Sequence, residues 1–187
     1  SPANKRLKVL RSFAVFYYLE MESRIQGARK KKKSTPIKHG IMIENLQSIK
    51  PGSGLGILKF GMSRDQAKEL LGEPDEIEKY SYTEEDEEWT EAWHYDTLEL
   101  SLGFDEVDEW KLTTLSVTSK FYELENKKLI GLHKNEILPL LNDLQMEDYE
   151  IDDLTSDGTP HQELIVSDSR GIHLWFAHEI LHEIEWG

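Results

Sequence analysis

The sequence contains no cysteine among its 187 residues. Disulfide frameworks, thiol catalysis and cysteine-ligated zinc are therefore excluded together. The absence of cysteine also fits a reducing compartment, so we expect a cytoplasmic protein. Long apolar runs are lacking too: the best one, residues 13–19, is followed at once by Glu20 and Glu22, whereas a membrane span needs roughly 18–20 apolar residues. The sequence therefore predicts neither a membrane helix nor a signal peptide.

The motifs that mark common active sites are also lacking. There is no nucleophile elbow, no dinucleotide fingerprint and no phosphate-binding loop, because the glycine-rich residues 52–56 lack the Gly-Lys-Ser/Thr ending. Carboxylates are so numerous that no acid–base pair can be singled out. We therefore expect no catalytic residues, no bound metal and no cofactor.

One exception is His178-Glu179-Ile180-Leu181-His182, which matches the HExxH signature of zinc hydrolases. In that chemistry a helix turns both histidines towards one zinc ion, and the glutamate polarises the bound water. Only five residues follow His182, too few for the second helix that usually supplies a third ligand. The repeat described below instead predicts His178 in a hairpin turn and His182 on a strand. A zinc hydrolase stays the alternative hypothesis.

Charge is divided unevenly along the chain. Residues 1–41 contain 11 Lys or Arg against Glu20 and Glu22, a net charge of +9, and residues 42–187 contain 11 Lys or Arg against 34 acids, a net charge of −23. Such an acidic region repels nucleic acid and anionic membranes and attracts basic partners. We therefore expect a basic protein partner and no contact with nucleic acid or membrane.

Residues 1–41 differ from the rest of the chain. A basic run at 29–33 follows a stretch that predicts a helix, because its apolar residues are spaced by four: Val9, Phe13, Tyr17 and Met21. Met42 fits a native start, so we interpret 1–41 as a basic N-terminal extension that is a fusion, a linker or translated upstream sequence. The alternative is a basic helix that docks on the acidic domain.

An internal repeat organises the acidic domain, residues 42–187. Residues 61–67 align with 131–137 at an offset of 70. The repeat units cover about 53–118 and 121–187.

Each unit contains one predicted helix. Ser63 and Gln66 form a capping box at the start of the first helix, and Gly72 ends it. In the second unit His133 replaces the serine, and Pro139 predicts a kinked or shifted helix because it lacks the N–H that a helix needs.

After each helix the apolar period changes to two, which indicates strands. Three strands are predicted in each unit, at 93–95, 98–104 and 112–117 and at 163–166, 172–176 and 180–186. One unit is too small to bury its sheet face, so we expect the two copies to stack on a shared core. The sequence predicts an α+β fold of two tandem αβββ-like units, each a helix packed on an antiparallel meander, with an N-terminal helical and basic extension.

The segments 54–63 and 70–74 (Gly-Leu-Gly-Ile-Leu-Lys-Phe-Gly-Met-Ser and Leu-Leu-Gly-Glu-Pro) carry a family resemblance. They resemble the opening and the helix stop of helix-plus-meander domains related to the β-lactamase-inhibitor-protein fold, and they are similar to bacterial toxin immunity proteins. Only the first unit has the full set of glycines and the proline at these positions. The resemblance implies an inhibitor or a scaffold without catalytic residues. It assigns no site residue, because the binding surfaces of those families vary.

The strongest candidate site combines acidic and aromatic residues between the first helix and its strands. Successive carboxylates repel one another unless they are solvated or meet a basic partner, and neighbouring tryptophans offer apolar anchors. The candidate partner-binding residues are Glu84, Glu85, Asp86, Glu87, Glu88, Trp89 and Trp93. Residues 105–110 and 147–153 repeat the combination. The opposing interpretation is that the tryptophans belong to the core and the acids to solvated loops.

These observations favour a non-catalytic binding or inhibitor module over an enzyme. We expect an immunity protein that neutralises a basic toxin, such as a nuclease, by covering its active surface. The alternatives are the zinc hydrolase described above and an assembly scaffold that binds through sheet edges. The sequence leaves the partner and the oligomeric state open.

Overall fold

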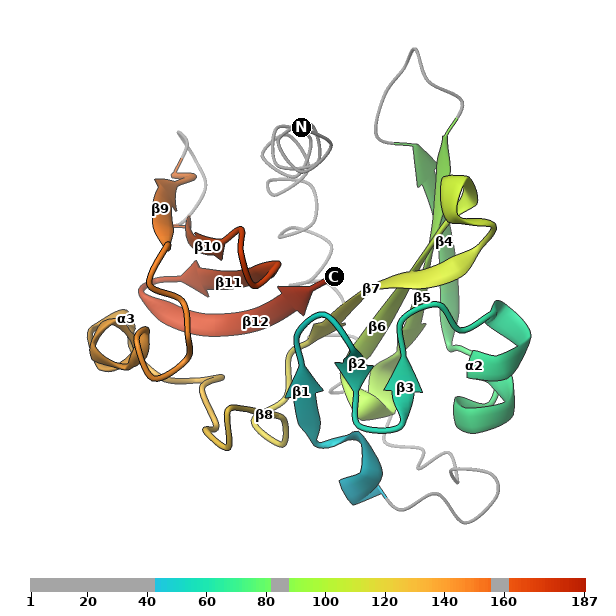
Figure 1. Cartoon of the computed structure of the whole chain (residues 1–187), viewed down its shortest axis with the longest axis horizontal. Coiled ribbons are helices and arrows are strands. Elements are labelled where there is room, and N and C mark those ends of the chain that lie inside the picture. The colour runs from blue at the N-terminus through green and yellow to red at the C-terminus, as the bar shows by residue number, and fades with distance from the viewer. Residues whose placement is uncertain (1–42, 82–87, 156–161) are drawn as a thin grey trace.

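The computed structural model describes residues 43–81, 88–155 and 162–187 (Figure 1). A large sheet of eight strands dominates this part of the chain, in the order β4-β5-β6-β7-β12-β11-β10-β9. Every pair of neighbouring strands in it is antiparallel. Its strands are β4 (Glu76–Ser81), β5 (Trp89–Tyr95), β6 (Leu100–Asp105), β7 (Lys111–Val117), β9 (Glu150–Asp153), β10 (Gln162–Ser167), β11 (Ile172–Ala177) and β12 (Ile180–Trp186).

The large sheet consists of two four-stranded meanders joined edge to edge. At the join, β12 pairs with β7, and Ile184 lies opposite Val117. The strands form because apolar residues alternate along them: in β6, Leu100, Leu102 and Phe104 are buried on one face. The short 3-10 turns η2 (Asp96–Leu98) and η3 (Glu106–Asp108) connect β5 to β6 and β6 to β7.

A small sheet in the order β3-β2-β1-β8 packs beside the large one. It contains β1 (Ser48–Lys50), β2 (Gly54–Leu55), β3 (Leu58–Lys59) and β8 (Glu123–Leu124), and the 3-10 turn η1 (Ile43–Leu46) precedes it. In the glycine-rich residues 52–56, glycine allows two backbone segments to approach closely. A Cβ on Gly56, whose φ is +54°, would lie 1.7 Å from the carbonyl oxygen of Asn45, so only glycine fits.

Two helices begin as the sequence predicts. Helix α2 (Arg64–Leu71) has the expected capping box, because the Ser63 hydroxyl accepts from the Gln66 amide and the Gln66 side chain accepts from the Ser63 amide. Helix α3 (Lys134–Ile137) passes into the 3-10 turn η4 (Leu138–Leu140) at Pro139. The predicted distortion of the second helix at Pro139 is confirmed. None of the helices in the described ranges is long and apolar enough to span a membrane.

The core lies on one face of the large sheet. Apolar residues of α2, α3 and the small sheet form a single cluster with this face, which we call the packed face. Figure 1 shows both helices and the small sheet on the same side of the large sheet. Trp186 of β12 is fully buried, and its Nε1 donates to the carbonyl oxygen of Gly54 at 3.0 Å, which ties the two sheets together.

The predicted α+β fold of two αβββ-like units is wrong. The described residues are mostly β, with twelve strands in two sheets and two short helices of eight and four residues. A strand exists at each expected position, 93–95, 98–104, 112–117, 163–166, 172–176 and 180–186, although β6 begins at Leu100 because Leu98 belongs to η2. However, the two meanders do not stack face to face. They lie side by side in one sheet, because β7 of the first meander pairs with β12 of the second through antiparallel hydrogen bonds. The predicted N-terminal helical extension, 1–41, lies outside the described residues.

Candidate protein-interaction surface

The structure separates the predicted partner-binding residues. Glu84, Glu85, Asp86 and Glu87 lie outside the described residues. Glu88 is exposed immediately before β5, and Trp89, the first residue of β5, is 39% exposed. Trp93, four residues along the same strand, is only 3% exposed.

Trp93 is a core residue. Its ring packs on Phe104 with the ring centroids 4.8 Å apart, and its Nε1 donates to Glu91 Oε2 at 3.1 Å. Both Trp89 and Trp93 point to the packed face, because residues two apart on a strand share a side. Their burial differs because Trp89 is the first residue of β5, whereas Lys68 of α2 lies over the Trp93 ring, with Nζ 5.5 Å from its centroid. Of the two tryptophans, Trp89 is therefore the one exposed enough to contact a partner.

A second acidic segment of the sequence meets Trp89 in space. The backbone amide of Trp89 donates to Glu106 Oε2 at 3.2 Å, and the Thr90 hydroxyl donates to Asp105 Oδ1 at 2.5 Å. These bonds bring the start of β5 against η3, where Val107 is 60% exposed. We call the resulting exposed group the acidic tip; it comprises Glu88, Trp89, Glu106, Val107, Asp108 and Glu109.

Cations and aromatic rings alternate beneath the acidic tip. Lys79 Nζ lies 5.3 Å from the centroid of the Trp89 ring and 5.2 Å from that of the Trp110 ring. Arg64 Cζ lies 4.7 Å from the Trp110 centroid, and Arg64 Nη1 pairs with Glu91 Oε1 at 3.0 Å. We call Trp89, Lys79, Trp110 and Arg64 the cation–aromatic stack. It fixes the orientation of the exposed ring, because each cation is attracted to the ring faces beside it.

The acidic segment 147–153 is used differently. Asp148 accepts hydrogen bonds from the Ser167 hydroxyl and the Ser169 amide. These bonds, the one from Ser167 first, lower the pKa of Asp148. Tyr149 and Ile151 next to it are 40% and 45% exposed. Asp148 thus ties the residues before β9 to the end of β10, the strand with which β9 pairs.

The HExxH match does not lie on a helix. His178 and Glu179 form the two-residue turn between β11 and β12, both with positive φ, and His182 lies on β12. The predicted hairpin turn and strand are confirmed. Burial, followed by the charge of His178, lowers the pKa of His182. No group of three or more possible metal ligands is found in the ranges that the structure describes.

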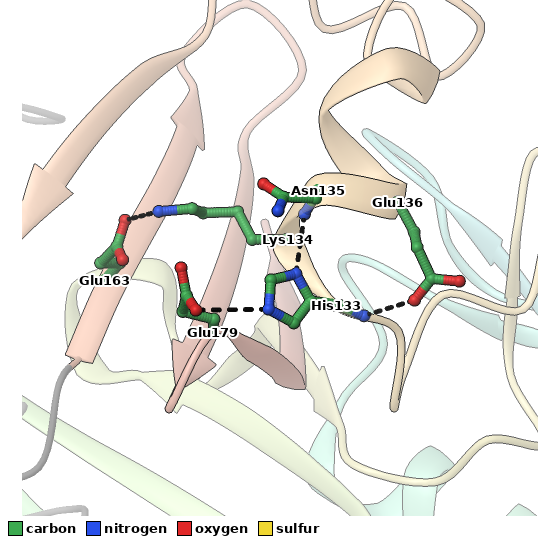
Figure 2. A network of polar contacts seen from close by, with 6 residues as sticks. All are labelled: His133, Lys134, Asn135, Glu136, Glu163 and Glu179. Carbon is green, nitrogen blue, oxygen red and sulfur yellow. Dashed lines mark hydrogen bonds and ion pairs between the residues drawn. The ribbon is translucent and has the colours of Figure 1, made fainter.

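The turn of this motif is tied to the start of α3 (Figure 2). His133 Nε2 lies 3.3 Å from Glu179 Oε2, and the amide of Lys134 donates to the Glu179 carbonyl at 2.7 Å. His133 also caps the helix: its Nδ1 accepts from the amide of Asn135 at 3.1 Å, and its own amide donates to Glu136 Oε2 at 2.9 Å. Glu179 therefore has a structural partner in place of the metal-bound water that a zinc site requires.

Sequence reasoning missed the cation–aromatic stack. Lys79 lies on β4, a strand that apolar alternation does not reveal, and Arg64 lies on α2. Lys79 comes opposite Glu91 in the pairing of β4 with β5. The contact between Lys79 and Trp89 depends on that pairing. The contact between Arg64 and Trp110 depends on the bridge between Ser63 and Lys111. Both contacts join separate segments of the sequence, so no local signal could have identified them.

Comparison with known proteins does not assign this chain to a family. No family model and no curated protein matches the sequence. Among solved structures, the fold is similar to an extracellular protein containing an SCP domain from Bacillus anthracis str. Ames, with a TM-score of 0.40 and 15% sequence identity over 83% of this chain. The match spans 48% of that protein's chain. This degree of likeness supports no argument about function.

Proposed function

We propose that this protein is a non-catalytic module that binds a basic protein through the acidic tip, as an immunity protein binds and neutralises a toxin. One observation carries the proposal: the bond from the Trp89 amide to Glu106 joins two acidic segments around exposed apolar side chains. Charged residues around a desolvated aromatic residue are typical of binding surfaces.

The charges of the acidic tip favour a basic partner. Glu88, Glu106, Asp108 and Glu109 all lie exposed there, on a domain whose residues 42–187 carry a net charge of −23. Carboxylates at the rim accelerate association with a cationic surface and act mainly on the association rate. They contribute less to the lifetime of the complex.

Trp89 and Val107 supply the apolar contact. A partner that covers the exposed parts of both side chains removes apolar area from water, which stabilises the complex. Lys79 already lies against the Trp89 ring and against the Trp110 ring beside it. Less side-chain freedom is then lost on binding than for an unsupported ring.

A nuclease fits the partner chemistry best. Its active cleft must be cationic to hold phosphates, so an acidic protein covering that cleft both binds well and blocks the substrate. The module needs no catalytic residue for this task. Neutralisation follows from occupancy alone.

The test uses the full chain as bait in an extract of its source cells, followed by identification and purification of the captured protein. The rates of association and dissociation are then measured with the purified partner. Trp89→Ala is expected to speed dissociation about 30-fold, since an aromatic anchor is worth on the order of 2 kcal/mol. Tyr149→Ala is the matched control, because Tyr149 is 40% exposed elsewhere on the surface.

The charge of the tip is tested separately. Glu88→Gln, Glu106→Gln and Glu109→Gln together are expected to slow association and flatten its salt dependence. The control removes the same number of charges at Glu44, Glu69 and Glu147, which are exposed away from the tip. Equal effects of Trp89→Ala and Tyr149→Ala on dissociation, or a partner whose activity is not inhibited in the complex, would refute the proposal.

A further inference from the structure

The large sheet has a second face with a different chemistry. The strand register places on it the residues that alternate with the packed face, and we call it the polar face. Strand β5 contributes Thr90, Ala92 and His94, β11 contributes His173, Trp175 and Ala177, and β12 contributes Glu183 and Glu185. The helices and the small sheet lie on the opposite side of the sheet (Figure 1).

The polar face is acidic from one end to the other. Its carboxyl groups come from both outer strands and from the middle of the sheet: Glu76, Glu78, Asp105, Glu150, Asp152, Glu183 and Glu185. Of these, Asp105 and Glu183 are buried and accept hydrogen bonds within the sheet, whereas the outer strands carry the exposed Glu76 and Glu150. Among the lysines and arginines of the described strands, the register places Lys111, opposite Asp105, on this face. A surface of this composition favours a cationic occupant.

The polar face also has the features of a covered surface. Ala92, Leu164, Val166 and Ala177 are at most 8% exposed although they do not belong to the core cluster. Within the described part of the chain, two buried polar atoms on this face have no hydrogen-bond partner: Oε1 of Gln162, a residue that is 7% exposed, and Nε1 of Trp175 on the neighbouring strand. Buried polar atoms are rarely left unpaired in proteins, so these atoms point to a polar occupant of the face.

We propose that the basic segment 1–41 of this chain docks on the polar face. Its net charge of +9 complements the carboxylates. Its apolar residues at four-residue spacing, Val9, Phe13, Tyr17 and Met21, match the buried alanine, leucine and valine side chains there. Peptide groups and side chains of such a segment can bond to Gln162 and Trp175.

The connection is long enough for this contact. About 20 residues separate Met21 from Ile43, and a fully extended chain of that length reaches roughly 70 Å. A second copy of the chain could offer the same segment, but an attached segment acts at a high effective concentration. The intramolecular contact therefore prevails in dilute solution.

Hydrogen exchange of the full chain tests the proposal. Amides of residues 9–21 are expected to be protected at 50 mM NaCl and to exchange at least tenfold faster in 1 M NaCl, because salt screens the charges. Glu76→Lys with Glu150→Lys, both at exposed positions, should accelerate exchange at least threefold at low salt. The matched control is Glu69→Lys with Asp143→Lys, which makes the same charge change at exposed positions of the helical side.

Thermal unfolding of each variant shows that the domain stays folded, so a change in exchange reports on docking. Absence of protection in the wild-type chain would overturn the proposal. So would equal exchange in the polar-face variant and the control. Loss of protection on dilution from 100 µM to 1 µM would overturn the intramolecular contact in favour of a second copy.

Discussion

Glu183 provides the sharpest test of the structure at the residue level. Its side chain is buried at the join of the two meanders, where it accepts a hydrogen bond from the Ser116 hydroxyl. Burial, followed by the nearby Glu185, raises its pKa from 4.5 to about 7, even though the hydrogen bond from Ser116 and the charge of His173 act to lower it. In the unfolded chain the same carboxyl group ionises near its ordinary value.

Proton linkage fixes the direction in which the free energy of unfolding changes with pH. Between pH 4.5 and 7 the folded protein binds more protons at Glu183 than the unfolded chain does, so the free energy of unfolding falls as the pH rises through this window. Below pH 4.5 Glu183 is protonated in both the folded and the unfolded state, so its ionisation costs no stability. Above pH 7 it is ionised in both states, and the full cost of burying its charge applies. The difference between the two pKa values corresponds to on the order of 3 kcal/mol.

Glu183→Gln should remove this penalty, because glutamine has the same shape, keeps an acceptor for Ser116 and never ionises. We expect the variant to be more stable than the wild type at pH 8 by on the order of 3 kcal/mol, with little difference near pH 4.5. Urea unfolding followed by tryptophan fluorescence at several pH values measures this, with Glu69→Gln on exposed α2 as the control. Titrating groups that do not interact with Glu183 are common to both chains and cancel, whereas Glu185 and His173 interact with it and belong to the measured difference. Parallel curves for wild type and Glu183→Gln from pH 4.5 to 8 would refute the reasoning.

Further predictions concern packing and caps. Trp93→Ala should lower the free energy of unfolding by about 3–5 kcal/mol, because it empties a core site, whereas Trp89→Ala should change it much less; urea denaturation of both variants measures the contrast. Ser63→Ala should cost about 1 kcal/mol in the same assay, because the Gln66 amide loses its acceptor; an unchanged midpoint would contradict the cap. His133→Ser should keep the start of α3 but remove the contact with Glu179, so amide exchange at the β11–β12 turn should accelerate while the unfolding midpoint shifts little. Unchanged exchange there would show that the backbone bonds alone hold the turn.

Apolar alternation predicted the strands that have one packed face. In β6, Leu100, Leu102 and Phe104 repeat every second residue, and the opposite side faces away from the core cluster. Strand β4 was missed because its apolar residue Ile77 is 49% exposed at the sheet edge, where no second buried position accompanies it. The small sheet was missed because its strands of two or three residues are too short to show a period.

The relative position of the two meanders was the main error in the fold. Buried hydrophobic strands are compatible with stacking face to face and with extending one sheet edge to edge, because both arrangements bury the same side chains. The pairing of Glu185 with Ser116 and of Trp186 with Leu115 selects the second arrangement. Backbone hydrogen bonds between segments about 70 residues apart leave no local mark in the sequence. In the site, likewise, the acidic and aromatic residues were visible, but the bond between Trp89 and Glu106 was not.

The two meanders end in loops of different kinds, and this difference favours one end of the large sheet for the proposed binding surface. Strands β11 and β12 are joined by the tight turn at His178 and Glu179, whose backbone and side chain are bound to the start of α3. Strands β6 and β7 are joined by a longer connection that contains η3 and exposes Val107. A tight turn fixed to a helix offers a partner little surface, whereas the η3 connection offers exposed carboxylates and an apolar centre on a rigid base. Because the longer connection occurs at the meander that also carries Trp89, the binding surface of the large sheet is expected at that end and not at the HExxH turn.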